Sequence, residues 1–103
     1  AYTFTFFASR LNVSDNREAY YALAGNTADT VYLDPVGNTS AVVVSAAIVP
    51  DASGQITLEV GPGPNNTNSS HFYYLGAMAV EVVPEPSTAL LLTLAAAALI
   101  RRR

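Results

Sequence analysis

Side chains that commonly carry catalysis are sparse in this chain of 103 residues. His71 is the only histidine, and there is no cysteine, which excludes thiol catalysis, thiolate metal sites and disulfides within this stretch. A serine–histidine–aspartate triad would have to use His71, and no Gly-x-Ser-x-Gly segment presents a nucleophile. We therefore expect no catalytic residues, with His71 in a loop or at a strand edge.

Two pairs of carboxylates lie close together in the sequence. They are Asp15 with Glu18 and Asp29 with Asp34. Glycoside hydrolysis needs two carboxylates at a fixed separation, and neither pair has flanking residues that would set one. The sequence favours solvated loop charges at these positions.

A short polar segment is the candidate metal site. Asn12, Asp15 and Asn16 crowd one loop, and oxygen ligands from such loops suit Ca²⁺, although the spacing is not that of an EF-hand. Calcium is thus the one cofactor that we hypothesise. The alternative is that asparagine and aspartate stand here as good turn formers.

Tyrosines are the candidate ligand-binding residues. A tyrosine ring offers a flat apolar face with a polar tip, which suits stacking on a sugar. The alternative is that alternating tyrosines, Tyr21 among them, fill one side of a sheet. The candidate binding set is Tyr20, Tyr32, Tyr73 and Tyr74.

Strands must position these side chains. Apolar and polar residues alternate over residues 2–9 and 55–60, which is the period of a half-buried strand. Turn signals separate six strand-like segments, which predicts a mostly β fold, an antiparallel sandwich or jelly roll spanning residues 1–83. The other predicted strands are residues 18–23, 30–33, 41–49 (buried on both faces) and 72–83, the last interrupted near Gly76.

Charge is divided unevenly along the chain. All eight acidic residues precede the apolar C-terminal segment, where only Arg10 and Arg17 are basic, which leaves a net charge of −6. An acidic region without lysine argues against nucleic-acid binding. Ala1 leads straight into a predicted strand, so we also expect earlier strands and a signal peptide upstream, and residues 1–83 to be an N-terminally truncated module.

The C-terminal tail, residues 84–103, has three physical zones. Pro84-Glu85-Pro86 cannot continue a central strand, and Ser87 can cap a following helix. Residues 88–100 carry no charge and consist chiefly of alanine and leucine, so we predict a single-pass membrane helix over residues 89–100. Residues 87–100 reach only about 21 Å as a helix, which favours a transient anchor over a permanent one. The terminal arginines should stay cytoplasmic.

This order of residues resembles the PEP-CTERM sorting signal of Gram-negative bacteria. Residues 83–88 read V-P-E-P-S-T, as the family usually does. The resemblance implies recognition by an exosortase, cleavage near the prolines, and delivery to the cell surface or extracellular matrix. The residues that carry this signal are Pro84, Glu85, Pro86, Ser87, Arg101, Arg102 and Arg103.

A second resemblance concerns residues 1–83. The strings Y-T-F-T-F-F-A-S-R, N-R-E, P-D-A-S-G and Y-L-G are similar to the second half of galactose-binding-like jelly-roll modules of secreted bacterial proteins. The sequence thus predicts an exported surface or matrix protein with a non-catalytic binding or structural module, with polysaccharide as the expected ligand. The alternative is an accessory module of a secreted hydrolase whose catalytic domain lies upstream of residue 1.

Overall fold

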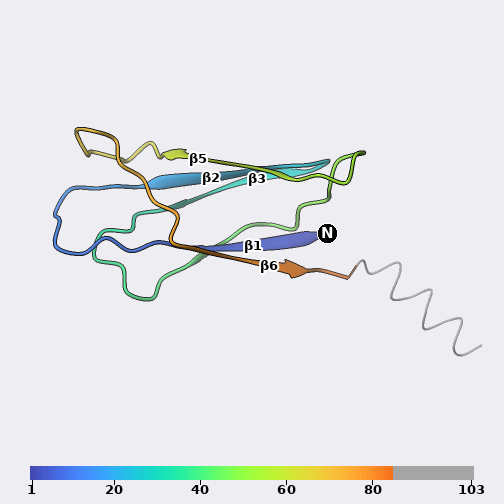
Figure 1. Ribbon diagram of the computed structural model, residues 1–103, viewed down its shortest axis with the longest axis horizontal. Helices are drawn as coiled ribbons and strands as arrows, with labels where there is room; N and C mark the ends of the chain where they lie inside the picture. The colour runs from blue at the N-terminus through green and yellow to red at the C-terminus, as the bar shows by residue number, and fades with distance from the viewer. Residues whose placement is uncertain (85–103) are drawn as a thin grey trace, which may run out of the picture.

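Two three-stranded antiparallel sheets face each other in the computed structural model, which describes residues 1–84 (Figure 1). One sheet has the order β4-β1-β6 and the other β3-β2-β5. This arrangement confirms the predicted mostly β, antiparallel fold. The strands are β1 (Tyr2–Phe7), β2 (Ala19–Ala24), β3 (Ala28–Leu33), β4 (Val43–Val44), β5 (Thr57–Pro62) and β6 (Ala77–Val82).

The core lies between the two layers and follows from the alternation of the strands. Phe4 and Phe6 on β1 point inward, as do Tyr21 and Leu23 on β2, and all four are buried. The rings of Phe6 and Tyr21 stack with their centroids 4.4 Å apart and their planes 5° from parallel. This stack is a direct contact between the central strands of the two sheets.

The prediction of one long buried strand over residues 41–49 was wrong. Only Val43–Val44 pairs with β1, and both Val42 and Val44 are exposed. Ser45 turns inward instead, where its hydroxyl accepts a hydrogen bond from the Phe4 N–H at 3.0 Å. A side-chain oxygen therefore replaces part of the backbone ladder, and the strand ends after two residues. Ile48, fully buried, restores a single bridge to Tyr2.

The last strand is shorter than predicted for a similar reason. It begins at Ala77, and residues 72–76 belong to the preceding loop. Asn68 Oδ1 accepts a hydrogen bond from the Phe72 N–H, and Asn66 Nδ2 donates to the Phe72 carbonyl. These asparagines bind the backbone groups of Phe72 that would otherwise join a ladder.

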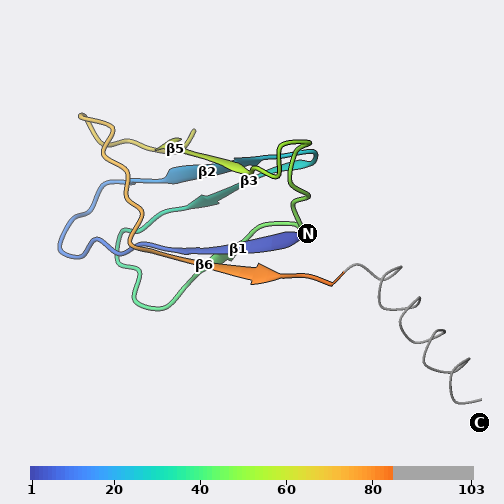
Figure 2. The same cartoon turned by 45° about the vertical axis from the view of Figure 1, so that its right-hand side comes forward.

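One side of the two-layer structure is open. Strands β3 and β4 contact each other, whereas β5 and β6 are the free outer strands of the two sheets and lie apart, β5 at the top and β6 at the bottom of the body (Figures 1 and 2). Met78 and Val80 pair with inward-facing residues of β1, yet they are 46% and 49% exposed. No strand among residues 1–84 covers either free edge. Within residues 1–84 there is also no helix that is long and apolar enough to cross a membrane.

Candidate functional site

The outer face of the β3-β2-β5 sheet holds two of the predicted binding tyrosines. Tyr20 on β2 is directly opposite Tyr32 on β3, and paired residues of an antiparallel sheet share a face. On the other side of Tyr20 lies Gly61 of β5. A Cβ atom added to Gly61 would lie 2.6 Å from the Tyr20 ring, so the ring occupies the space that a side chain at position 61 would need.

A hydrogen bond from its hydroxyl fixes the orientation of the Tyr20 ring. The hydroxyl donates this hydrogen bond to Glu59 Oε1 at 2.6 Å. The pKa of Tyr20 is raised, first by this hydrogen bond, then by desolvation and by the charges of Glu59 and Tyr73. Tyr73 lies in the loop that follows β5 and is 46% exposed. We name Tyr20 and Tyr32, with Glu59 and Gly61 beside Tyr20, the tyrosine face; Tyr32 is 48% exposed.

Tyr74, the fourth predicted binding tyrosine, lies apart from this face. Its hydroxyl accepts a hydrogen bond from Arg17 Nη1 at 2.6 Å, and its carbonyl accepts one from the Tyr21 hydroxyl at 2.5 Å. Tyr74 packs against the core and holds the long loop to the body. The structure thus brings two of the four predicted tyrosines, Tyr20 and Tyr32, together.

Glu59 and Gly61 belong to the tyrosine face but were not among the predicted site residues. The signal for Gly61 was a glycine directly after the alternating β5 segment, where a neighbouring strand carries a tyrosine. The register that places it beside Tyr20 is a tertiary property, which a single strand does not reveal.

The predicted calcium ligands are engaged by protein donors. Asp15 Oδ1 accepts from Arg17 Nε at 3.0 Å, and Asp15 Oδ2 accepts from Asn68 Nδ2 at 2.7 Å. Asn16 Oδ1 accepts from the Glu18 N–H. Asn12, at φ 64°, is exposed. Within residues 1–84 no three histidine or acidic residues cluster as metal ligands would. Calcium binding stays a prediction, and the ion would have to displace these donors.

Three of the carboxylates considered for catalysis accept hydrogen bonds from loop residues. Glu18 is buried and accepts hydrogen bonds from the N–H and Nδ2 of Asn65. Asp29 accepts from the Ala46 N–H, and Asp34 accepts from the N–H groups of two loop residues. His71 is exposed in the loop before β6, as its neighbourhood predicted. Through these hydrogen bonds, Glu18, Asp29 and Asp34 hold the loops in place.

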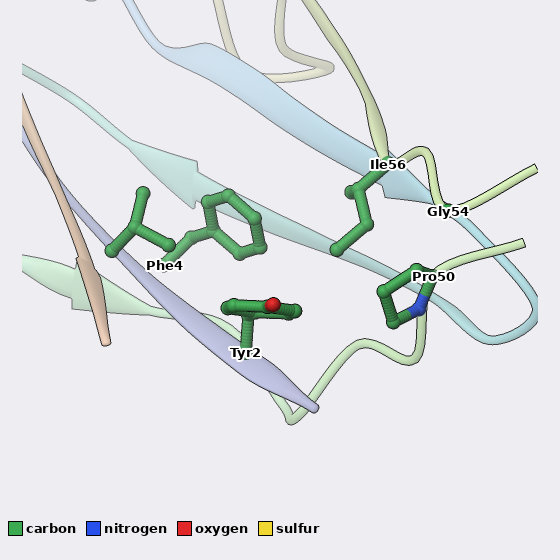
Figure 3. Close-up of a pocket in the computed structure, with 6 residues that line it drawn as sticks. Tyr2, Phe4, Pro50, Gly54 and Ile56 are labelled. Atoms are coloured by element: carbon green, nitrogen blue, oxygen red, sulfur yellow. The ribbon is translucent and has the colours of Figure 1, made fainter. Parts of the chain in front are cut away.

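An apolar pocket of about 230 Å³ opens at one end of the core (Figure 3). Tyr2 and Phe4 of β1 form one wall, and Ile56 and Pro50 form the other. Val80 of β6 completes the lining, which places the pocket beside the free edge of β6 and the loop that leads into β5. No charged side chain lines it.

The folded body ends just before Pro84. The Val83 N–H donates to the Ala1 carbonyl at 2.8 Å, and Pro84 follows it, exposed and outside the sheet. Residues 82–103 match the family model of the PEP-CTERM protein-sorting motif. This chain carries a PEP-CTERM sorting signal. The match confirms the resemblance noted in the sequence, and it marks the chain as an exported protein, sorted to the cell surface as an exosortase substrate.

Other comparisons add nothing to the PEP-CTERM assignment. No curated protein and no solved structure matches the chain. The resemblance of residues 1–83 to galactose-binding-like modules therefore stays a hypothesis. The predicted membrane helix over residues 89–100, with Glu85, Pro86, Ser87 and Arg101 to Arg103, lies outside the described residues.

Proposed function

We propose that this PEP-CTERM protein acts at the cell surface or in the extracellular matrix as a non-catalytic module that binds polysaccharide through its tyrosine face. The observation that carries the proposal is the pairing of Tyr20 with Tyr32 on the outer face of the β3-β2-β5 sheet, with the exposed Tyr73 of the loop after β5 as a further stacking candidate. A sugar ring can stack on such rings while its hydroxyls reach polar groups nearby, here Glu59.

The surroundings of the tyrosine face suit a flat, extended ligand. Beside the rings, the outward positions of β2 and β3 carry small side chains, among them Ala22 and Thr30. A platform of rings on a sheet of small residues accommodates a chain of sugars lying across it. The acidic body favours neutral or cationic polysaccharides over polyanions.

Binding is tested by titrating surface polysaccharides into the protein with Tyr32→Ala and Tyr73→Ala variants. Each substitution should weaken binding roughly two- to tenfold, because aromatic contacts contribute about 0.5–1.5 kcal/mol. Phe72→Ala is the matched control: Phe72 lies in the same loop, but its ring sits under Arg17, 5.7 Å from the guanidinium carbon. Full binding by both tyrosine variants, or no binding to any glycan, would leave the module with a structural role only.

The second part of the proposal is the processing of the tail. We expect the exosortase to cleave near Pro84-Glu85-Pro86 while the apolar segment anchors the chain transiently in the inner membrane, with the terminal arginines on the cytoplasmic side. Replacing Pro84 and Pro86 together by alanine should leave the protein uncleaved and membrane-associated. Pro64→Ala, in an exposed loop of the body, should be processed normally. An intact mass that does not change when the exosortase gene is deleted would contradict the proposal.

A further inference from the structure

The open edge of the sandwich carries free backbone hydrogen-bonding groups on two strands. In an antiparallel ladder, alternate residues point their N–H and C=O groups to the same neighbour. The hydrogen bond from Val83 to Ala1 fixes this alternation for β6, so Met78, Val80 and Val82 direct their backbone groups away from β1. These groups have no partner strand among residues 1–84.

Strand β5 repeats this arrangement in the other sheet. The Gly63 N–H donates to the Glu18 carbonyl, so the alternation directs the backbone groups of Leu58 and Val60 away from β2. The backbone of Pro62 also points away from β2, so the N–H that proline lacks is not needed for pairing with β2.

The same residues of β6 leave apolar side chains uncovered. Met78, Val80 and Val82 share a face with the inward residues of β1 and are exposed. Leu58 and Val60 share a face with the inward residues of β2 and are only partly buried against the core. Val82 is 71% exposed. Exposed strand edges are normally protected by lysine, proline or a bulge. Strand β6 has no lysine or proline, and its one charge, Glu81, points to the outer face.

Strand directions decide what kind of segment fits. Strands β1 and β5 run the same way, and β6 runs opposite to both (Figures 1 and 2). A strand joined to the start of β1 by a turn would run opposite to β1, and it would therefore be antiparallel to β5. A second strand, joined by a turn to the start of the first, would run opposite to that one, and it would therefore be antiparallel to β6. Two consecutive strands joined by a single turn can thus form antiparallel pairs with both free edges.

We propose that two further β-strands of the same polypeptide, preceding Ala1, pair with β6 and β5 in that order and close the open edge. Their inward side chains are apolar at every second position, and they cover Val80, Val82 and the pocket beside Tyr2. The completed body has two four-stranded sheets, which is the eight-strand arrangement of a jelly roll. This proposal concerns the inner face of the sheets and is independent of polysaccharide binding at the outer tyrosine face.

Charge favours this occupant over a second copy of the chain. The described residues contain two arginines and seven carboxylates, a net charge of −5 in each copy. Two such bodies joined edge to edge repel each other, whereas a segment of the same polypeptide is held close by its covalent connection.

Amide hydrogen exchange on the complete gene product tests the proposal. The amides of Val80, Val82, Leu58 and Val60 should be protected, and they should exchange rapidly, or the body should fail to fold, in the chain that begins at Ala1. The proposal is overturned if these amides exchange rapidly in the complete product, or if nothing precedes Ala1 in the gene. It is also overturned if the chain from Ala1 forms a discrete dimer with the same amides protected.

A pair of variants of the complete product tests the inward side chains. Val80→Lys should lower the melting temperature and speed amide exchange along β6, because it places a charge on the inner face that the added strands would cover. Ala79→Lys is the matched control, since Ala79 is the next residue on β6 and faces outward. Equal effects of the two lysines would contradict a covered inner face.

Discussion

The Tyr21 hydroxyl is a single polar group that links the core to the long loop after β5. Tyr21 is fully buried, and its hydroxyl donates to the Tyr74 carbonyl at 2.5 Å. Tyr21→Phe keeps the ring stack on Phe6 but leaves that carbonyl without its donor. We expect a loss of about 1 kcal/mol in the free energy of unfolding, measured by urea denaturation. Tyr32→Phe, on the exposed face, should leave the unfolding midpoint unchanged.

Asp15 links the pH dependence of stability to the loop network. Its pKa is lowered below the usual value of 3.8, first by the hydrogen bond from Asn68, with further help from Arg17. A lowered pKa in the folded state means that the charged form stabilises the fold above pH 3.8, and that this contribution is lost as the pH falls through the folded-state pKa. Asp15→Asn should flatten the acid limb of a stability–pH curve. Glu81→Gln, on the outer face of β6, is the control and should leave that limb steeper than Asp15→Asn does.

The turn between β2 and β3 depends on a close approach of two backbones. A Cβ atom on Gly25 would lie 2.3 Å from the Val49 carbonyl oxygen, which also accepts a hydrogen bond from the Asn26 N–H. Gly25→Ala therefore forces the two segments apart, and we expect a cost of about 1–3 kcal/mol in thermal or urea unfolding. Ala24→Ser, one residue earlier and exposed, should change stability by less than about 0.5 kcal/mol.

At the level of elements, the sequence predicts the strands whose two faces differ. Alternation located β1 and β5 because the inward residues of each strand are apolar and the outward ones mostly polar; Leu58 and Val60 of β5 are partly buried against the core, and Thr57 and Glu59 are exposed. It failed over residues 41–49, where a run of valine has no period and a serine hydroxyl takes over part of the backbone pairing. Residue type, and not alternation, made Tyr20 and Tyr32 binding candidates. It did not separate them from Tyr74, because the role of Tyr74 depends on Arg17, 57 residues away.

The whole molecule depends on contact between its two sheets, since neither three-stranded layer can bury its apolar face alone. Phe6→Ala removes the ring that stacks on Tyr21, and should cost about 3–5 kcal/mol. This loss is a large share of the stability of a small domain. Phe7→Ala makes the same chemical change one residue later on the opposite face, and should cost less. Equal unfolding midpoints for the two variants would contradict the described core.

Sheet order is the property of the whole molecule that no local pattern contains. Paired residues of β1 and β6 are 70 to 80 positions apart in the sequence, from Phe7 with Ala77 to Tyr2 with Val82, and β2 pairs with β5 across about a third of the chain. Such pairings are fixed when the inward faces of both layers meet, so they emerge only with the tertiary structure. The sorting tail is the opposite case, because a short linear string is read by an enzyme and needs no fold.

The hydrogen bond between Val83 and Ala1 also fixes how much chain lies between the folded body and the proposed membrane segment. Only residues 84–88 separate that bond from the segment, a span of at most about 18 Å when fully extended. Under the proposed processing, we therefore expect the body to stay close to the bilayer until cleavage removes the anchor.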